Sequence, residues 1–419
     1  MLAILCSSWI FVLYINTVNS GTFSDVTSLY DDLTTSHNPH LRPETNQNLA
    51  TTIYTSFTLI SLLDIDAVEG TVSITGYFTM TWTDRNLIWT PSNYGLIAKV
   101  TFPSDTIWRP PLIIGNSATS FKMIGMKDSY IKVVRTGLVL WQPGESIIFT
   151  CSIDSTYFPF DTQVCTCSLL VWGFDIDEVE LHKSQTTIDT DVYQGNSEWD
   201  LFKTKIAEAD EGINFEFHFK RRPMFLVISI ILPVMFISLL NIFVFILPQE
   251  SGERVGLAIT SLLSIVVFLT IAQELLPATA LPRLSAICVT LTIDMFMSGC
   301  IIISVIISSW LYHRSTDKTI PLWIQKVVLC RLPCRKTKRS KSITVSEVMA
   351  TNKVKPQDVE NDLDHKDHDP DQLSWQQVSS FWDKLSTMFY IVWFVSSLLV
   401  FVIDVYIGTS STWTVIFCN

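Results

Sequence analysis

The stretch that decides the fold is Cys151-Ser152-Ile153-Asp154-Ser155-Thr156-Tyr157-Phe158-Pro159-Phe160-Asp161-Thr162-Gln163-Val164-Cys165. Its two cysteines enclose thirteen residues, and the tip Phe158-Pro159-Phe160-Asp161 is apolar and stiffened by a proline. Such a tip fits poorly in a soluble enzyme and is typical of a rigid element that presses against an apolar surface. The rest of the chain should therefore supply that surface.

Four apolar segments downstream of this stretch are long enough to cross a bilayer. They are predicted at Met224–Leu247, Val255–Ala272, Leu284–Leu311 and Met388–Ile407. At about 1.5 Å per residue, the first segment spans about 36 Å, which exceeds the ~30 Å hydrocarbon core of a membrane. Upstream, period-two stretches such as Thr71–Phe78 and Ile213–Phe219 predict the short strands of a β-sandwich. With 48% hydrophobic residues, the chain is best explained as a soluble domain joined to a membrane domain.

The domain boundaries follow from these segments. Basic residues predominate just after the third span, which indicates that the polar stretch between the third and fourth spans is cytoplasmic. An apolar amino-terminal segment is typical of a secretory signal. The predicted order is a signal peptide (1–20), an extracellular β-sandwich (21–222), to which the resemblance described below assigns ligand binding, membrane helices one to three (223–311), a cytoplasmic region (312–387), membrane helix four (388–407) and an extracellular tail (408–419). The cytoplasmic region is expected to hold an amphipathic helix (about 319–332), a disordered acidic linker (about 353–373) and a helix leading into the membrane.

A loop closed by two cysteines and followed by four spans resembles the Cys-loop receptors, the pentameric ligand-gated ion channels, and in particular their nicotinic acetylcholine receptor-like members. The resemblance covers nearly the whole chain. It implies a Cys151–Cys165 disulfide, an immunoglobulin-like extracellular sandwich, a four-helix transmembrane bundle and a pentameric ring in the plasma membrane, with both termini outside and a postsynaptic setting. Departures from the nicotinic pattern suggest a divergent, invertebrate member.

The second span carries the predicted pore. Residues spaced by three and four share one helical face, and here they are Glu253, Gly256, Thr260, Leu263, Val267, Thr270 and Glu274. In a ring of subunits, acids at both rims would favour cations, and the central aliphatics could close the pore by dewetting. Packing in a helical bundle would explain Leu263 and Val267 but not the charged rims. Glu253 matches the family's selectivity carboxylate, while Gly256 departs from the usual hydroxyl residue. Glu250 is either a further inner ring or a cytoplasmic surface acid.

The agonist site is less complete than the pore. The family binds agonist between subunits in a cage of aromatic side chains. Trp172 matches the central tryptophan of that cage, and Tyr77 matches an aromatic of the adjacent face; either could instead be a core residue. Gly115 stands where the family usually has a tyrosine. The hairpin between Leu201 and Ile213 lacks the adjacent cysteine pair and the tyrosines. We therefore expect an agonist other than acetylcholine.

A coupling zone between the two domains is implied by the resemblance. Its predicted members are Phe158, Pro159, Phe160, Asp161, Asp66, Val68, Arg221 and Pro282. The family's glutamate partner of Arg221 is replaced by Ala67, so Asp66, Glu69 or Asp161 would have to take its place. The alternative is that these are loose surface charges of little energetic weight.

The expected function is that of a subunit of an extracellular-ligand-gated cation channel. The alternative is an accessory or non-conducting subunit that needs partner subunits for agonist binding and gating. Expected partners are a small-molecule agonist, Na⁺ and K⁺, the lipid bilayer and four further subunits; Ca²⁺ permeability and homomer against heteromer stay open. No enzyme activity, cofactor, metal or nucleic acid is expected. Cys167 is either a buried thiol or bonded to Cys418, and Asp294, deep in the third span, must have a partner that the sequence does not identify.

Overall fold

The structure is a computed structural model that describes residues 21–35, 37–125, 129–276, 284–315, 319–331 and 373–417. The predicted signal peptide, Pro282, Cys418 and residues 353–372 of the predicted linker lie outside the described residues. Contacts divide the chain into two compact units, a strand-rich unit up to Pro223 and a helical unit that begins at Met224. Each unit is described by itself.

A short helix, α1 (Phe23–Thr35), precedes the strands. It begins with a capping box, because the Thr22 backbone N–H donates to Asp25 Oδ2 at 2.8 Å and the Asp25 N–H donates to Thr22 Oγ1 at 3.3 Å. The hydrogen bonds from Thr22, the backbone one first, hold the pKa of Asp25 below its usual value. Leu29 and Leu33 are buried on the inner face of the helix.

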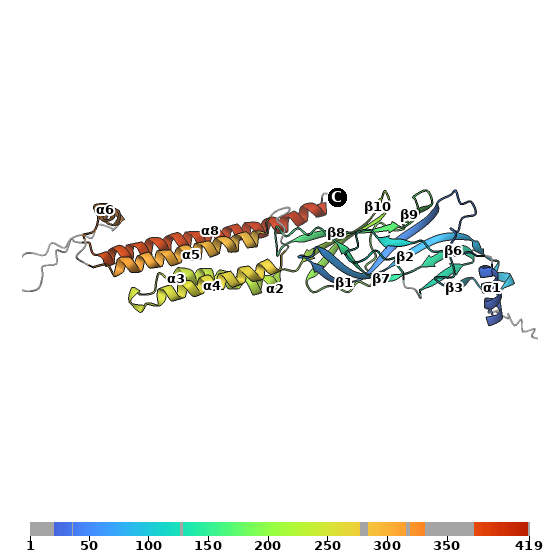
Figure 1. The fold of residues 1–419 in the computed structure, drawn as a ribbon, viewed down its shortest axis with the longest axis horizontal. Coiled ribbons are helices and arrows are strands. Elements are labelled where there is room, and N and C mark those ends of the chain that lie inside the picture. Colours follow the sequence, from blue (N-terminus) through green and yellow to red (C-terminus); the bar gives the residue numbers. More distant parts are fainter. Residues whose placement is uncertain are drawn as a thin grey trace, which may run out of the picture. The chain divides into compact units, whose positions relative to one another are not determined.

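The strands form two sheets (Figure 1). The larger sheet has the order β3-β5-β6-β2-β1-β9, with β7 also paired to β2, and the smaller has the order β10-β11-β8-β4. Their bounds are β1 (Thr51–Asp66), β2 (Thr71–Ile88), β3 (Lys99–Pro103), β4 (Leu112–Ile114), β5 (Tyr130–Val134), β6 (Thr136–Trp141), β7 (Gly144–Thr150), β8 (Thr162–Val171), β9 (Val179–Lys183), β10 (Trp199–Ala209) and β11 (Gly212–Arg221), with a 3₁₀ turn η1 (Pro91–Asn93). The predicted β-sandwich is confirmed.

The core of the sandwich is aromatic. Buried and half-buried residues alternate along β2, which is the period-two pattern expected of a strand with one face in the core. Phe57 and Phe78 of the larger sheet lie 4.8 Å apart between ring centroids, and Phe57 lies 5.7 Å from Phe215 of the smaller sheet. These tilted ring contacts join the two sheets.

Four helices of the second unit are long and apolar enough to cross a membrane, which confirms the predicted four-helix fold. The first span is made of α2 (Met224–Leu226), a π-helical turn η2 (Val227–Ile231) and α3 (Leu232–Phe243); the others are α4 (Glu253–Glu274), α5 (Ala286–Tyr312) and α8 (Trp375–Phe417). The π turn directly precedes Pro233, whose ring and missing N–H disturb regular helical bonding.

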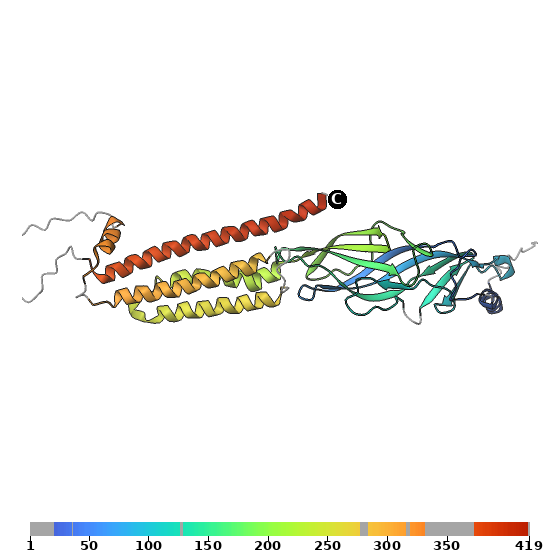
Figure 2. The same ribbon diagram turned by 45° about the horizontal axis from the view of Figure 1, so that its top comes forward.

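Two features set the ends of the helices. Gly252 follows the 3₁₀ turn η3 (Gln249–Ser251) with φ +67°, a left-handed conformation that glycine adopts without strain, and α4 begins at the next residue. A short helix α6 (Leu322–Arg331) contributes Val328 to a small apolar cluster with Leu311 and Trp375. Figure 2 shows α8 separating from the other spans toward its carboxyl end.

Candidate functional site

The predicted pore face of α4 is free of contacts that would bury it within the chain. All seven predicted residues, from Glu253 to Glu274, are exposed, and the side chain of Leu263 is 63% exposed. The opposite face of α4 is buried in the bundle through Arg254, Ala258, Ser261, Ile265, Leu269 and Ala272. The helix therefore packs on one face and presents the other outward.

The exposed stripe of α4 combines acids, small residues and aliphatics in the predicted order. The hydroxyls of Thr260 and Thr270 donate to the carbonyls of Leu257 and Val267 in their own helix, at 2.9 and 2.8 Å. These bonds satisfy the hydroxyl protons and leave oxygen lone pairs available to a ligand or water. A Cβ placed on Gly256 would meet no atom within 4 Å, so packing inside this chain does not require glycine there.

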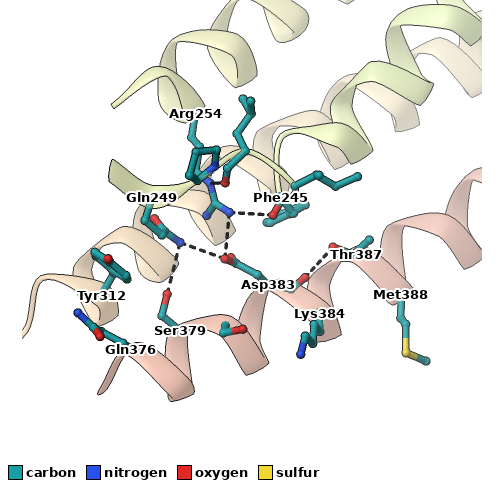
Figure 3. A pocket seen from close by; sticks show the side chains of 14 residues that line it. Phe245, Gln249, Arg254, Tyr312, Gln376, Ser379, Asp383, Lys384, Thr387 and Met388 are labelled. Atoms are coloured by element: carbon teal, nitrogen blue, oxygen red, sulfur yellow. Dashed lines mark hydrogen bonds and ion pairs between the residues drawn. The ribbon is translucent and has the colours of Figure 1, made fainter. Parts of the chain in front are cut away.

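A polar cluster fixes the amino-terminal end of α4. Its members, which we call the end cluster, are Gln249, Arg254, Ser308, Ser379 and Asp383. Figure 3 shows several of them along the wall of a groove between the α3–α4 turn and α8. Arg254 Nε donates to the carbonyl of Leu247 at 2.6 Å, and Nη2 donates to the carbonyl of Phe245 at 2.7 Å and to Asp383 Oδ2 at 3.0 Å.

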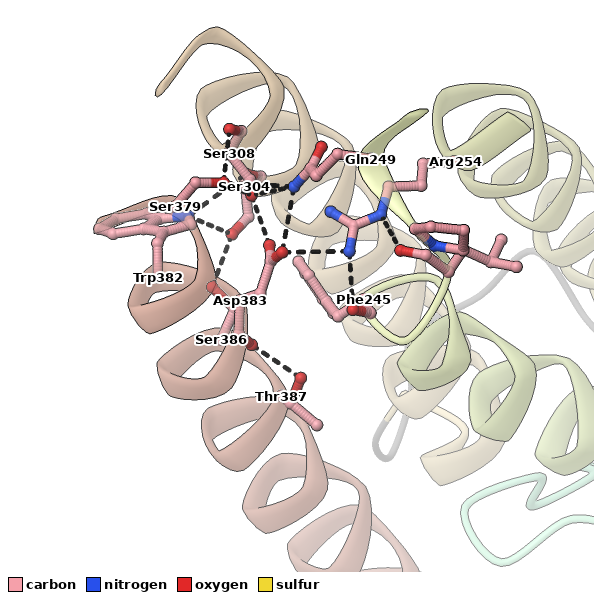
Figure 4. Close-up of polar contacts among 12 residues, drawn as sticks. Phe245, Gln249, Arg254, Ser304, Ser308, Ser379, Trp382, Asp383, Ser386 and Thr387 are labelled. Atoms are coloured by element: carbon pink, nitrogen blue, oxygen red, sulfur yellow. Dashed lines mark hydrogen bonds and ion pairs between the residues drawn. The ribbon is translucent and has the colours of Figure 1, made fainter. Parts of the chain in front are cut away.

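Gln249, in the turn η3, links the end cluster to both α5 and α8. Its Nε2 amide lies 2.7 Å from Ser308 Oγ on α5, 3.0 Å from Asp383 Oδ2 and 3.3 Å from Ser379 Oγ on α8 (Figure 4). Arg254 is buried beside Glu253, which is exposed, so consecutive residues of α4 have opposite functions: one anchors the helix and the other faces outward. The sequence analysis missed this anchor. The available signal was a basic residue on the face of α4 opposite the stripe.

In the strand-rich unit, the predicted disulfide is confirmed: Cys151 and Cys165 are bonded. Within the loop, Asp161 is the partner of Arg221. Arg221 Nε donates to Asp161 Oδ1 at 2.7 Å, and Nη2 donates to Oδ2 at 3.2 Å. Gln163 Nε2 donates to the same carboxylate at 2.6 Å. Of the three partners left open by the sequence, the structure selects Asp161.

Aromatic rings enclose the Arg221 guanidinium. Its Cζ lies 4.1 Å from the ring centroid of Trp199 and 4.9 Å from that of Phe158. The side chains of Arg221 and Asp161 are only 11% and 2% exposed. The alternative that these are loose surface charges is therefore wrong for this pair. The pair joins the disulfide loop to the last residues of β11.

The β1–β2 turn contains Asp66 and Glu69, which were candidate partners of Arg221, but Asp66 stabilises the turn itself. Asp66 Oδ1 accepts the backbone N–H groups of Val68 at 2.8 Å and of Glu69 at 2.9 Å. Asp66 thus stabilises its own turn, and Val68 is exposed at the tip. The structure places Asp66 as a turn residue rather than as the partner of Arg221.

Trp172 lies on the surface rather than in the core. Its side chain is 57% exposed, and its ring stacks on the exposed ring of Phe121 with 6.2 Å between centroids. Phe121 was not identified from the sequence, because it lies in a loop without a period. Tyr77 is half-buried in β2 of the other sheet, next to the fully buried Phe78. Within one chain, Tyr77 therefore lies in a strand of the larger sheet, whereas Trp172 lies directly after β8 of the smaller sheet.

The structure explains two of the aromatic side chains that the predicted cage lacks. A Cβ at Gly115 would lie 2.5 Å from Leu170 Cδ1, so Leu170 occupies the space of a larger side chain. Strands β10 and β11 pair up to Ala209 and Gly212, which leaves Asp210 and Glu211 as a tight turn. No aromatic residue lies between Lys203 and Gly212. From Lys203 onward the pairing is regular, and the hairpin ends in a tight turn with two acidic residues.

Two minor predictions can now be located. Cys167 is a buried thiol, and burial raises its pKa to about 12. Glu250 accepts a hydrogen bond from the Tyr312 hydroxyl at 2.9 Å, so its carboxylate lies against α5. A disulfide-closed loop, a β-sandwich and four apolar helices with one polar, outward-facing stripe together define the architecture of a neurotransmitter-gated ion channel.

Comparison with known proteins agrees with this architecture. The profile of the neurotransmitter-gated ion-channel ligand binding domain matches residues 26–223, and that of the transmembrane region matches residues 230–379. The chain belongs to the neurotransmitter-gated ion-channel family. That family consists of channels rather than enzymes, and its members are multi-pass plasma-membrane proteins with an extracellular amino-terminal domain.

Several relatives are nicotinic receptor subunits. The neuronal acetylcholine receptor subunit alpha-6 of Homo sapiens is 30% identical over 73% of this chain and 64% of its own length. The acetylcholine receptor subunit beta-like 1 of Drosophila melanogaster is 30% identical over 78% of this chain and 66% of its own length. The neuronal acetylcholine receptor subunit alpha-3 of Homo sapiens is 30% identical over 73% and 62%. The chain thus spans somewhat less than two thirds of the length of these relatives.

Proposed function

We propose that this chain is one subunit of a pentameric, cation-selective channel opened by an extracellular ligand, with α4 lining the pore. The observation that carries the proposal is the two-sided structure of α4. One face is anchored in the bundle by Arg254 and small or aliphatic residues, and the other exposes a stripe from Glu253 to Glu274. Copies of this helix around an axis would place rings of carboxylates at both rims, which attract Na⁺ and K⁺.

The gate would be the aliphatic middle of the stripe. Leu263 and Val267 are exposed within each subunit, so five copies can face one another across the axis. A narrow apolar ring excludes water when closed and conducts when it is widened or made polar. Ligand binding between the extracellular units would shift the population toward the wider state.

The agonist would be a ligand other than acetylcholine. Trp172 and Phe121 offer an exposed aromatic surface, but the end of the hairpin from Lys203 to Gly212 supplies no aromatic residue, and Leu170 fills the space beside Gly115. A quaternary ammonium group needs several ring faces around it. Tyr77 lies in β2 of the larger sheet and Trp172 directly after β8 of the smaller sheet, and in the proposed ring the Tyr77 of a neighbouring subunit would complete the cage around the ligand.

The test removes the need to know the agonist. Leu263→Thr places a hydroxyl in the apolar ring, and we expect it to give a standing cation current in cells that express the chain. In that background, Glu253→Ala should move the reversal potential toward weaker cation preference in a NaCl gradient. Glu250→Ala is the matched control, because Tyr312 holds that carboxylate against α5. An unchanged reversal potential in the Glu253→Ala channel would refute the assignment of the selectivity ring.

A second candidate function is an accessory subunit, and the short acidic hairpin favours it. Such a subunit would contribute α4 to a shared pore while partners bind the agonist. Expression of this chain alone, with Leu263→Thr, separates the two functions. Current from the chain alone supports a complete channel, whereas current only upon co-expression with relatives supports the accessory function.

A further inference from the structure

The third span carries an acid whose partner the sequence could not identify. Asp294 lies in α5 and is buried. In hydrocarbon an ionisable side chain is costly, so it must contact other protein groups or water. Its polar neighbours are Ser238 of α3 and Trp393 of α8. Asp294 is therefore at the meeting point of three membrane helices.

A small cavity lies at this meeting point. It has a volume of about 30 Å³ and is lined by Asp294, Ser238, Asn241, Ser298 and Trp393 among apolar residues. We call it the Asp294 cavity. A single water molecule requires about 10–15 Å³ of such space, so the cavity has room for one or two water molecules.

Three polar atoms at the Asp294 cavity make no hydrogen bond of standard geometry with any described residue. Ser238 Oγ and Trp393 Nε1 face the Asp294 carboxyl without such a bond, and Asn241 Oδ1 has no partner. Asn241 is only 3% exposed, and its Nδ2 amide already donates to Ser298 Oγ at 3.2 Å. Turning the amide over would exchange the two atoms and leave Nδ2 without an acceptor. Either orientation therefore leaves one buried polar atom of Asn241 unsatisfied.

The chemistry of the unsatisfied atoms identifies the occupant. Trp393 Nε1–H is a donor only, and Asn241 Oδ1 is an acceptor only. A metal cation would satisfy the acceptors but not the indole N–H, and an apolar ligand would satisfy neither. A water molecule accepts from Trp393 and donates to Asn241 or to the Asp294 carboxyl. We propose that the Asp294 cavity is a water-binding site at which ordered water bridges α3, α5 and α8.

The bridge would matter most for α8. Within its most apolar window only 6% of α8 is buried, compared with 28% for each of the other three spans. Apolar packing therefore holds α8 weakly, and polar links must carry more of its attachment. One set of links is the end cluster, and the water bridge at Trp393 would be a second, separate one along the same helix.

The first test is an experimental density map of the unmodified full-length assembly at a resolution that shows ordered water. We expect a solvent peak within about 2.7–3.2 Å of Trp393 Nε1 and of Asn241 or Asp294. A dry cavity in which Trp393 donates directly to Asp294 would overturn the proposal. Because the map uses the unmodified chain, it does not depend on whether any variant folds.

The second test uses thermal unfolding of the purified full-length chain in a bilayer disc. Trp393→Phe removes the N–H and keeps the ring, and we expect the midpoint to fall by about 1–3 °C. Trp310→Phe on α5 is the matched control, because Trp310 is exposed, and it should leave the midpoint unchanged. Equal midpoints for the two variants would contradict the bridge.

A cation in place of water is tested in the same assay. We expect the unmodified chain to unfold at the same temperature in NaCl, KCl and choline chloride of equal concentration. Asp294→Asn keeps the side-chain volume and should show the same indifference to the salt. Stabilisation by Na⁺ that disappears in Asp294→Asn would show that the cavity binds a cation, and it would overturn the water assignment.

Discussion

Replacing Arg221 by alanine should destabilise the extracellular unit strongly. The variant would leave the Asp161 carboxylate buried without its cation, while Gln163 Nε2 remains as one donor at 2.6 Å. Removing one partner of a buried ion pair costs about 3–5 kcal/mol. Because Gln163 stays bonded, we expect a loss near the lower end, about 3 kcal/mol. For a domain of this size that corresponds to a fall in the unfolding midpoint of about 6–12 °C.

The neighbouring residue provides the control. Arg222 Nη2 lies 3.4 Å from Asp200 Oδ1, but both side chains are more than half exposed, at 54% and 59%. Exposed pairs of this kind contribute less than about 1 kcal/mol. We would measure thermal unfolding and surface labelling of two full-length variants, Arg221→Ala and Arg222→Ala. The two variants compare a buried with an exposed arginine at consecutive positions. Similar midpoints for the two variants would refute the reasoning.

A double variant separates stability from gating. Arg221→Met with Asp161→Leu replaces the buried pair by apolar side chains of similar volume, which is often neutral for stability. We expect this variant to recover the unfolding midpoint lost in Arg221→Ala. The double variant is then combined with Leu263→Thr, and its standing current is compared with that of Leu263→Thr alone. If the two currents differ although the unfolding midpoint has recovered, the pair contributes to gating. If midpoint and current both return to normal, the pair is structural only, and its assignment to the coupling zone is wrong.

Three further predictions concern other parts of the chain. Asp383→Asn should leave the buried Arg254 guanidinium without a counter-charge, so its surface expression should fall. The control is Lys384→Gln, at an exposed neighbouring position of α8, which should keep normal expression. Equal expression of the two variants would contradict an anchoring function of the end cluster. Cys167 should resist maleimide at pH 8 in the folded protein and react after denaturation, because its raised pKa leaves almost no thiolate at that pH; labelling of the native chain would disprove this. Trp172→Ala should weaken the agonist response once an agonist is found, whereas the same change at Trp199, in the core, should reduce expression instead.

Much of the fold could be predicted because its signals are local. Spans of apolar residues identify membrane helices by length, and strict alternation identifies strands such as β2 and β11. The same holds for the stripe of α4, since residues spaced by three and four share a face in any helix. The two cysteines closed a loop of known length, and the resemblance supplied their pairing. None of these inferences required knowledge of distant contacts.

The missed features depend on contacts between residues far apart in the sequence. Arg254 and Asp383 are 129 positions apart, and neither position has a period that points to the other. Arg221 and Asp161 are 60 positions apart, and the sequence narrowed the choice to three acids without selecting one. Asp294 was recognisable as unusual because a lone acid in a membrane span is costly. Its neighbours on α3 and α8 could be identified only after the helices were packed.

The exposed faces of α4 and α8 differ in composition, which indicates that the two helices face different solvents. Along the span of α8 most exposed positions are apolar, among them Val392, Val395 and Leu399, with Ser396 as an exposed hydroxyl, and this face suits contact with lipid tails. Along α4 the exposed stripe interrupts its aliphatics with hydroxyls and ends in a carboxylate at each rim. Carboxylates facing hydrocarbon would lose hydration without a compensating partner, whereas the hydroxyls of Thr260 and Thr270 already donate to carbonyls of their own helix. A face of this composition suits contact with water, and in the proposed ring of such helices it would meet water at the axis.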